Sequence, residues 1–297
     1  MSPIEDGLRR AGTRRVLYRV LFLNLAVSLA KLTAGIMAHS LAVISDGLHS
    51  SIDAINNVVG LVLLRLAAKE PDAGHPYGHG KIETLGAFSI AGFMFITCYE
   101  VGKQALGRLF GDAPPTFEIT GVTFAVMAGT LIVNVFVVIY EKRAARRYSS
   151  EFLYADAVHT QSDVLVTTAV LAGLPFVMKG YLHWDAILAL SISAFIAWSG
   201  FQVLQKTVPI LLDAAAVDAE VIHKMASGLP RVVGVEDIRS RLHGGRKFVE
   251  LTLIVTENDL REAHDLTERL EEMIMERYGH AEITIHYEPA SHQDPRR

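Results

Sequence analysis

Long apolar segments constrain the fold of this chain more than any other feature of its sequence. They lie in the first two-thirds of the 297 residues, of which 51% are hydrophobic. Each is close to the roughly 20 residues that a helix needs to cross a bilayer, where every backbone polar group must be paired within the protein. The segments are about 16–37, 41–66, 84–109, 119–140, 152–177 and 183–206. They predict a six-helix transmembrane bundle within residues 1–208.

Positive charges in the connections predict how this bundle is oriented. Four arginines precede the first segment, and Lys142, Arg143, Arg146 and Arg147 follow the fourth. The connection after the second segment is also basic, whereas the other three contain at most one Lys or Arg each. Because Lys and Arg concentrate on the cytoplasmic side of membrane proteins, both termini are expected there. The first segment lacks a cleavage pattern, so we interpret it as a retained span rather than a signal peptide.

One polar pattern occurs twice inside these apolar segments. Both copies have the form D-x-x-H-x-x-x-D, which places three polar side chains on one face of a helix. The six residues are Asp46, His49, Asp53, Asp156, His159 and Asp163. Ionisable side chains at membrane depth are costly and are functional candidates by default. The alternative is that they only form hydrogen bonds that hold the helices together.

The predicted topology brings the two copies to the same depth. The second segment runs inward and the fifth outward, so a rise of about 1.5 Å per residue places His49 near Asp163 and His159 near Asp53. Two imidazoles and two carboxylates match the tetrahedral nitrogen and oxygen coordination of Zn²⁺. We therefore expect a transport site for a divalent transition metal, with zinc first. Asp46 and Asp156 would flank it, as ligands on the way in or out or as proton carriers.

The connection between the second and third segments contains a second group of potential metal ligands. Asp72, His75 and His79 lie within eight residues of a stretch punctuated by Gly and Pro. Such turns can gather three ligands on a surface loop. The alternative is an ordinary hydrophilic loop at the membrane surface.

After Pro209 the composition changes to that of a small soluble α/β module. His243-Gly-Gly-Arg246 predicts a hairpin turn, because paired glycines favour tight turns between strands. The order α-β-β-α-β predicts a small sheet with helices on one face, in a domain of residues 209–290. The tail, 291–297, is expected to be disordered. The predicted helices are 218–227 and 259–278, and the predicted strands are 235–243, 247–255 and 283–287.

Histidines of this module are candidates for a further metal site. His286 and Glu288 are two residues apart in a predicted strand, so their side chains lie on the same face. The alternative is that these are surface histidines of a soluble domain. The module contains His223, His243, His264, His280 and His286.

Composition, the absence of certain motifs and the neighbours of the histidines argue against several other functions. A net charge of −4 argues against nucleic acid as a partner. Cys98 is the only cysteine, so one chain can form neither a disulfide nor a thiolate metal cage. An intramembrane metalloprotease would need a motif such as H-E-x-x-H, which is absent. His49 and His159 could bind haem, but carboxylates beside them make this unfavourable.

Four stretches together resemble a known family. They are S-D-G-L-H-S-S-I-D at 45–53, H-P-Y-G-H-G-K-I-E at 75–83, H-T-Q-S-D at 159–163 and I-H-Y-E-P at 285–289. With them the chain resembles the cation diffusion facilitator family, of the zinc-transporter type of metal/proton exchangers, from about residue 12 to 289. The resemblance implies a six-helix bundle with a cytosolic ferredoxin-like domain, forming a homodimer through both domains. The expected location is a bacterial inner membrane.

The resemblance also implies roles for individual residues. The transport site of the family carries over onto His49, Asp53, His159 and Asp163. Its loop site falls on the loop residues named above, and a charge interlock near the dimer interface carries over onto Lys81 and Asp213. In the cytosolic domain, ligand positions carry over onto His264, His286 and Glu288.

The cytosolic positions only partly match the family pattern. Thr252 and Glu236 stand where members with a binuclear site have histidines. A weaker or single-metal site, using His243, is therefore expected instead.

The expected function is efflux of Zn²⁺ in exchange for H⁺, by alternating access around the midplane site. Zn²⁺ would be the substrate and also a regulatory ligand of the loop and the cytosolic domain. Two alternatives stay open at this point. The same fold could carry Fe²⁺, Mn²⁺, Cd²⁺ or Co²⁺, since these ions differ by geometry and availability as much as by ligand type. The chain could also be a metal-sensing scaffold subunit with little flux of its own.

Overall fold

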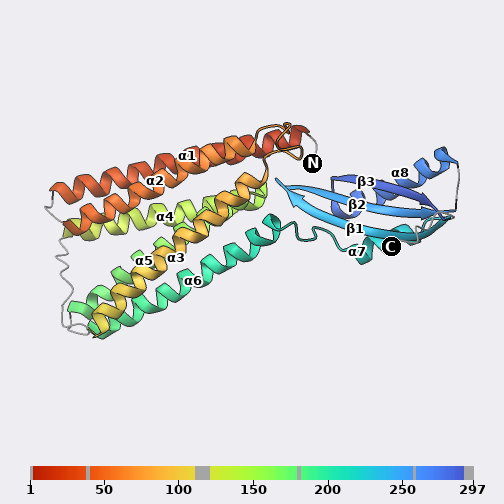
Figure 1. Ribbon diagram of the computed structural model, residues 1–297. Helices are drawn as coiled ribbons and strands as arrows, with labels where there is room; N and C mark the ends of the chain where they lie inside the picture. Colours follow the sequence, from red (N-terminus) through yellow and green to blue (C-terminus); the bar gives the residue numbers. More distant parts are fainter. Residues whose placement is uncertain (1–2, 38–40, 111–120, 179–181, 257–258, 291–297) are drawn as a thin grey trace. The chain divides into compact units, whose positions relative to one another are not determined.

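The computed structural model describes residues 3–37, 41–110, 121–178, 182–256 and 259–290 (Figure 1). At some positions within these ranges, including Asp46 and His49, only the backbone is described. The predicted disordered tail, 291–297, lies outside the described residues. Contacts within the chain divide it into two units. One is Arg9–Val208, and the other combines Met1–Leu8 with Pro209–Arg297.

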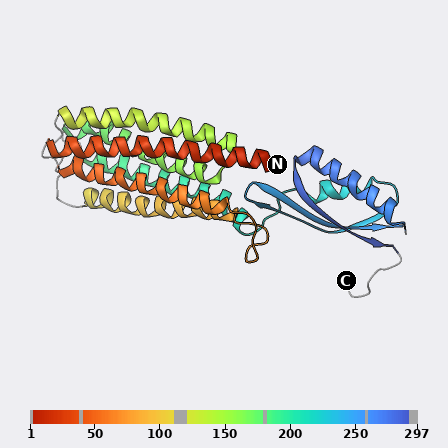
Figure 2. The same cartoon turned by 90° about the horizontal axis from the view of Figure 1, so that it is seen from above.

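Six long helices form the first unit. In Figure 1 they run in two groups that diverge toward one end, α1, α2 and α4 in one and α3, α5 and α6 in the other, and Figure 2 shows the same helices from above. In the described residues, five of them are long and apolar enough to cross a membrane; α5, which carries the second polar motif, does not meet this measure. The helices are α1 (Pro3–Met37), α2 (Leu41–Ala67), α3 (Lys81–Phe110), α4 (Gly121–Tyr148), α5 (Glu151–Met178) and α6 (Leu182–Leu211).

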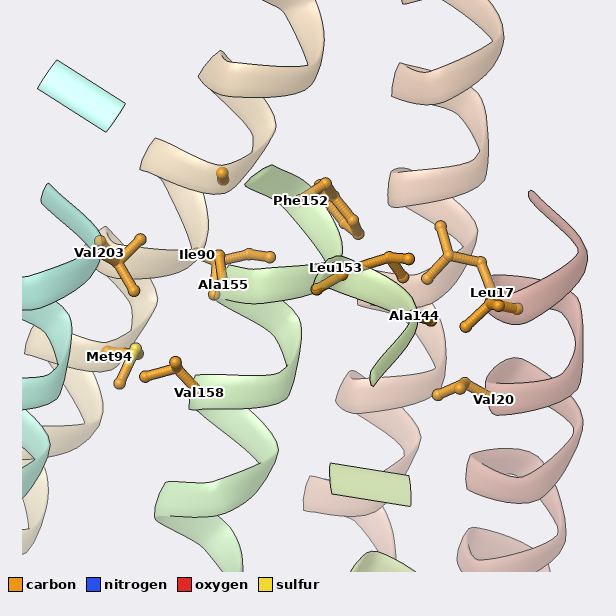
Figure 3. Packing of buried hydrophobic residues seen from close by; sticks show 14 of the residues in the cluster. Leu17, Val20, Ile90, Met94, Ala144, Phe152, Leu153, Ala155, Val158 and Val203 are labelled. Carbon is orange, nitrogen blue, oxygen red and sulfur yellow. The ribbon is translucent and has the colours of Figure 1, made fainter. Parts of the chain in front are cut away.

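The core of this unit is built around α5. Figure 3 shows Leu153 on the side of α5 that faces Leu17, and Val158 on the side that faces Met94. Small residues allow neighbouring helices to approach α5 closely. A Cβ on Gly60 of α2 would lie 2.3 Å from Cζ of Phe152, so only glycine fits there without a shift of the ring. This close approach brings the polar faces of α2 and α5 together.

The second unit is an α/β fold with a three-stranded sheet. The strand order is β1-β2-β3, with β1 and β2 antiparallel and β2 and β3 parallel. Gly244 and Gly245 have φ of 57° and 79°, as a tight hairpin between twisted strands requires. The elements are α7 (Ala219–Ser227), β1 (Val232–His243), β2 (Arg246–Val255), α8 (Leu260–Tyr278) and β3 (Ala281–Pro289). A helical bundle followed by a small α+β domain confirms the predicted fold class.

One face of the sheet forms the core of the α/β unit. Alternate residues of β2, such as Val249 and Leu253, are fully buried against Ile222 of α7 and against Leu270 and Ile274 of α8. β1 begins earlier than the predicted residue 235. The register shifts between Glu236 and Arg239, so a β-bulge lets the strand continue through a break in the alternation.

Candidate metal centre

Three of the four predicted transport ligands lie together between α2 and α5. One ligand atom from each of Asp53, His159 and Asp163 lies within 4.8 Å of the other two. Nε2 of His159 is 3.4 Å from Oδ1 of Asp53 and 3.8 Å from Oδ2 of Asp163. The i, i+4 spacing of His159 and Asp163 puts both on one face of α5. The close packing of α2 against α5 supplies the third candidate ligand, Asp53. His159 is only 7% exposed.

The other members of the first motif are not placed to the same detail. His49 precedes Asp53 by four residues in α2, about one helical turn. The side chains of His49 and Asp46 lie outside the described part of the structure, so the fourth predicted ligand is not described.

Asp156 takes part in a hydrogen-bond chain that is separate from the three candidate ligands. It is 4% exposed, and its Oδ2 accepts a hydrogen bond of 2.8 Å from Nδ2 of Asn57. Oδ1 of Asn57 in turn accepts a hydrogen bond of 2.7 Å from Nδ2 of Asn24. This chain of amides and a carboxyl links α1, α2 and α5 beside the candidate metal site.

Two residues of this polar region escaped the sequence analysis. Asn57 follows Asp53 by four residues, so a search for polar positions continuing along the motif face would have found it. Glu141 of α4 is completely buried. It directly follows the predicted span of 119–140 and precedes four basic residues, which is why it looked like part of a cytoplasmic connection.

The three residues of the predicted loop site also lie close together. Ligand atoms of Asp72, His75 and His79 lie within 4.8 Å of one another. Nδ1 of His75 is 3.3 Å from Oδ1 of Asp72, and Nε2 of His79 is 3.4 Å from Oδ2. The aspartate and His75 are exposed, whereas the side chain of His79 is 9% exposed and its buried Nδ1 has no hydrogen-bond partner among the described residues.

Backbone geometry holds the loop aspartate in place. Oδ1 of Asp72 accepts hydrogen bonds from the backbone amides of His75 and Gly74, at 2.8 and 2.9 Å. These amides, the one of His75 first, hold the pKa of the Asp72 carboxyl below its usual range. The turn thus presents an ionised carboxylate between two histidines.

The residues predicted for a cytosolic site are not gathered into one group. Nε2 of His286 is 3.5 Å from Oε1 of Glu288, and Nε2 of His264 is 3.3 Å from Oε1 of Glu268. His243 lies at the hairpin turn, opposite Arg246. Within the ranges that the structure describes, three-ligand groups occur only at the helix and loop sites.

Two further predictions concern the α/β unit. Thr252 pairs with His286 in the parallel register of β2 and β3, so a hydroxyl stands beside that histidine. The predicted interlock joins Lys81 of the bundle with Asp213 of the other unit. This contact between the two units stays a prediction.

Membrane-crossing helices around buried histidine and aspartate side chains define a class of protein that handles cations within a bilayer. Two family models match the chain: the cation efflux transmembrane domain over residues 17–212, and the cytoplasmic domain of cation efflux proteins over 215–290. The chain belongs to the cation diffusion facilitator family. It is a cation-efflux transporter and not an enzyme.

Several relatives are similar over most of their length. An uncharacterized transporter of Methanocaldococcus jannaschii is 33% identical over 270 residues, which cover 88% of this chain and 94% of the relative. The cation-efflux pump FieF of Serratia proteamaculans is 31% identical over 266 residues, which cover 89% of this chain and 88% of the relative. FieF of Salmonella typhi is 29% identical over 269 residues, covering 90% and 89%.

Proposed function

We propose that this protein exports a divalent transition-metal cation, zinc first, in exchange for protons. The transport site comprises His49, Asp53, His159 and Asp163. The observation that carries the proposal is the meeting of three ligand atoms from α2 and α5 within 4.8 Å. Asp156 flanks this ligand set, and its carboxylate accepts a hydrogen bond from Asn57.

The ligand spacing supports a small tetrahedral ion. Zn²⁺ binds nitrogen and oxygen at about 2.0–2.2 Å, so ligands of a tetrahedral ion are roughly 3.3–3.6 Å apart. The distances of 3.4 and 3.8 Å from Nε2 of His159 to the two carboxylates are close to that spacing. His49, one turn before Asp53, would complete two imidazoles and two carboxylates.

The same residues can couple the metal to protons. A proton on His159 offsets the neighbouring carboxylates when no metal is bound. Metal binding requires deprotonated ligands and therefore displaces such protons. Carrying Zn²⁺ one way and H⁺ the other then needs only one site that opens alternately to each side.

The termini, the loop site and the α/β unit have roles that fit this metal/proton exchange. Both termini face the cytoplasm of a bacterial cell whose inner membrane holds the bundle. The loop site and the α/β unit attract or sense cytosolic metal, and two copies form a homodimer. The His264, His286 and Glu288 positions would contribute only a weak metal site, since no three-ligand group forms among the described residues of the unit.

The test is metal flux into proteoliposomes across an imposed pH gradient. Wild type is compared with the double variant His49→Ala/Asp163→Ala and, as a matched control, with Asp72→Ala in the loop. Zinc movement that follows the gradient, is lost in the double variant and persists in the control is the expected result. Movement of iron or manganese without zinc would overturn the selectivity. No movement of any metal would favour a metal-sensing scaffold.

A further inference from the structure

The candidate metal site lies between two groups of helices that diverge toward one end of the bundle (Figure 1). The first group is α1, α2 and α4, and the second is α3, α5 and α6. Asp53 belongs to α2 in the first group and His159 to α5 in the second. Alternating access requires such a site to be closed at one end while it is open at the other. The contacts at the end where the groups converge therefore decide when the site can open there.

Arg9 and Glu83 form a buried ion pair at the converging end. Nη2 of Arg9, near the start of α1, is 3.6 Å from Oε2 of Glu83, near the start of α3, and the two side chains are 8% and 5% exposed. Ser150, which directly precedes α5, donates from Oγ to Oε1 of Glu83 at 2.5 Å. Both carboxylate oxygens thus have partners, and the ion pair joins the first helix group to the second.

Arg9 also binds the turn between α4 and α5. Its Nη1 donates to the backbone carbonyls of Ser149 and Tyr148, at 3.2 and 3.4 Å. The last carbonyls of a helix have no partner within that helix, so a guanidinium is well suited to them. One side chain of α1 therefore contacts the cytoplasmic end of α3 and the α4–α5 turn together.

Two polar contacts beyond the metal site, toward Met37, each join helices of one group. Nζ of Lys31 donates to Oγ of Ser50 at 3.0 Å, between α1 and α2. Oγ of Ser193 donates to the backbone carbonyl of Cys98 at 2.9 Å, between α6 and α3. The ion pair at the converging end differs from both because it crosses between the groups. This arrangement fits a bundle that is held together at one end and parts at the other.

We propose that Arg9 and Glu83 are positioning residues of the transport cycle, and that their ion pair closes the cytoplasmic end of the bundle below the metal site. The inference rests on the proposed alternating access and adds the contact that controls the loading side. His159 lies roughly 13 Å further along α5 than Ser150, at 1.5 Å per residue. The ion pair separates when the site opens to load metal and forms again when the site opens outward.

A buried ion pair suits a contact that must break and re-form. Its Coulomb attraction is largely offset by the cost of removing both charges from water, so the open arrangement with both charges hydrated is not much less stable. Removing one partner is different, because the other charge is left buried and uncompensated. Such a change should favour the open arrangement, in which water reaches the remaining charge.

The adjacent arginine provides a matched control. Nη1 of Arg10 donates to the backbone carbonyl of Ala68 at 2.8 Å, just past the end of α2 in the same helix group. Arg9→Met and Arg10→Met remove the same charge from successive positions of α1, but only the first breaks the ion pair between the groups. Glu83→Gln is a second test that does not alter α1. It keeps the shape of the side chain and an oxygen that can accept from Ser150.

A buried residue between the groups can report whether the cytoplasmic end is open. Leu153 of α5 is 0% exposed and faces Leu17 of α1 across the two groups (Figure 3). The reporter is Leu153→Cys in a chain that also carries Cys98→Ser, since Cys98 is the only native cysteine. The measured quantity is the rate at which this full-length parent chain, purified in detergent, reacts with a charged, water-soluble thiol reagent.

We expect Arg9→Met and Glu83→Gln each to react at least about tenfold faster than the parent, because losing one partner of a buried pair strongly destabilises the closed arrangement. Arg10→Met should react like the parent. Equal acceleration by Arg9→Met and Arg10→Met would overturn the proposal, since loss of any charge from α1 would then suffice. An unchanged rate in Glu83→Gln would overturn it too, whether or not Arg9→Met folds.

Transport kinetics provide a readout that a merely structural role would not move in this direction. A weakened closure raises the fraction of bundles open to the cytoplasm, so the apparent KM for Zn²⁺ presented on the cytoplasmic face of proteoliposomes should fall about threefold or more in Arg9→Met. A KM that stays the same or rises would contradict the proposal. The proposed function fails differently: a wild type that moves no metal would remove the export, while labelling that depends on Arg9 and Glu83 would leave the closure. Zinc flux with labelling independent of both residues sinks the inference alone.

Discussion

The helix site and the loop site contain the same types of side chain, aspartate and histidine, but differ in how these side chains are held and exposed. Asp53, His159 and Asp163 come from two helices, the first two are separated by 106 positions in the sequence, and His159 is 7% exposed. Asp72, His75 and His79 come from one short turn, and Asp72 and His75 are exposed. The first geometry depends on tertiary packing, whereas the second depends on local backbone hydrogen bonds.

This difference in geometry predicts different roles for the two sites in transport. Ligands fixed by packed helices and screened from water bind an ion selectively and can change access only when the helices move. Ligands on an exposed turn exchange with solvent and can adjust to an ion. We therefore expect transport to depend absolutely on the helix site and only partly on the loop site.

The largest effect should come from Asp163→Ala. Removing this carboxylate leaves the site short of a ligand and of a negative charge, so flux should fall to the level of protein-free liposomes. The change should not unfold the bundle, since the side chain is partly exposed at 17% and alanine suits a helix. Flux assays combined with size-exclusion chromatography check both statements. Full activity in this variant would disprove the site assignment.

A smaller effect is expected when one aspartate of each site is lengthened to glutamate, which compares how rigidly the two sites hold their ligands. Asp53→Glu and Asp72→Glu each move a carboxylate outward by one methylene. The packed helices cannot adjust, so Asp53→Glu should weaken metal binding by about tenfold or more. The exposed turn can move, so Asp72→Glu should weaken it less. Calorimetric titration of both variants measures this difference, and equal losses would mean that the two sites do not differ in stiffness.

The double variant His75→Ala/His79→Ala should have a still smaller effect on transport. Both imidazoles of the loop are lost, but the helix site is intact, so rate or apparent affinity should fall by less than about tenfold. Initial rates over a range of Zn²⁺ concentrations separate the two parameters. Complete inactivation would show that the essential site lies in the loop.

Most of the fold follows from sequence because it depends on local patterns. Apolar length predicts the six helices, and alternation and paired glycines predict the hairpin at Gly244 and Gly245. The boundaries are less predictable. Helix α4 continues to Tyr148, beyond the predicted residue 140, because the charged residues that end an apolar segment are good helix formers.

The candidate site shows a similar limit. Two copies of one motif on antiparallel helices predict which residues meet, because the depth of each follows from helical rise. The burial of Glu141 has no such signal, since it depends on how α4 packs against the other helices. Hydropathy places Glu141 at the edge of a span, whereas the structure buries it completely.

The smallest expected effect concerns the pH response of the loop. The amides of His75 and Gly74 lower the pKa of Asp72, so its carboxyl should titrate below the ordinary value of about 3.9. A lowered folded-state pKa means that these hydrogen bonds contribute fully above the unfolded value and are lost as pH falls through the folded one. NMR shifts of the His75 and Gly74 amides against pH measure this midpoint, and Asp72→Asn should abolish the titration. A midpoint at or above the ordinary value would show that the turn is not preformed, and the contrast between a fixed loop carboxylate and packed helix ligands would lose its basis.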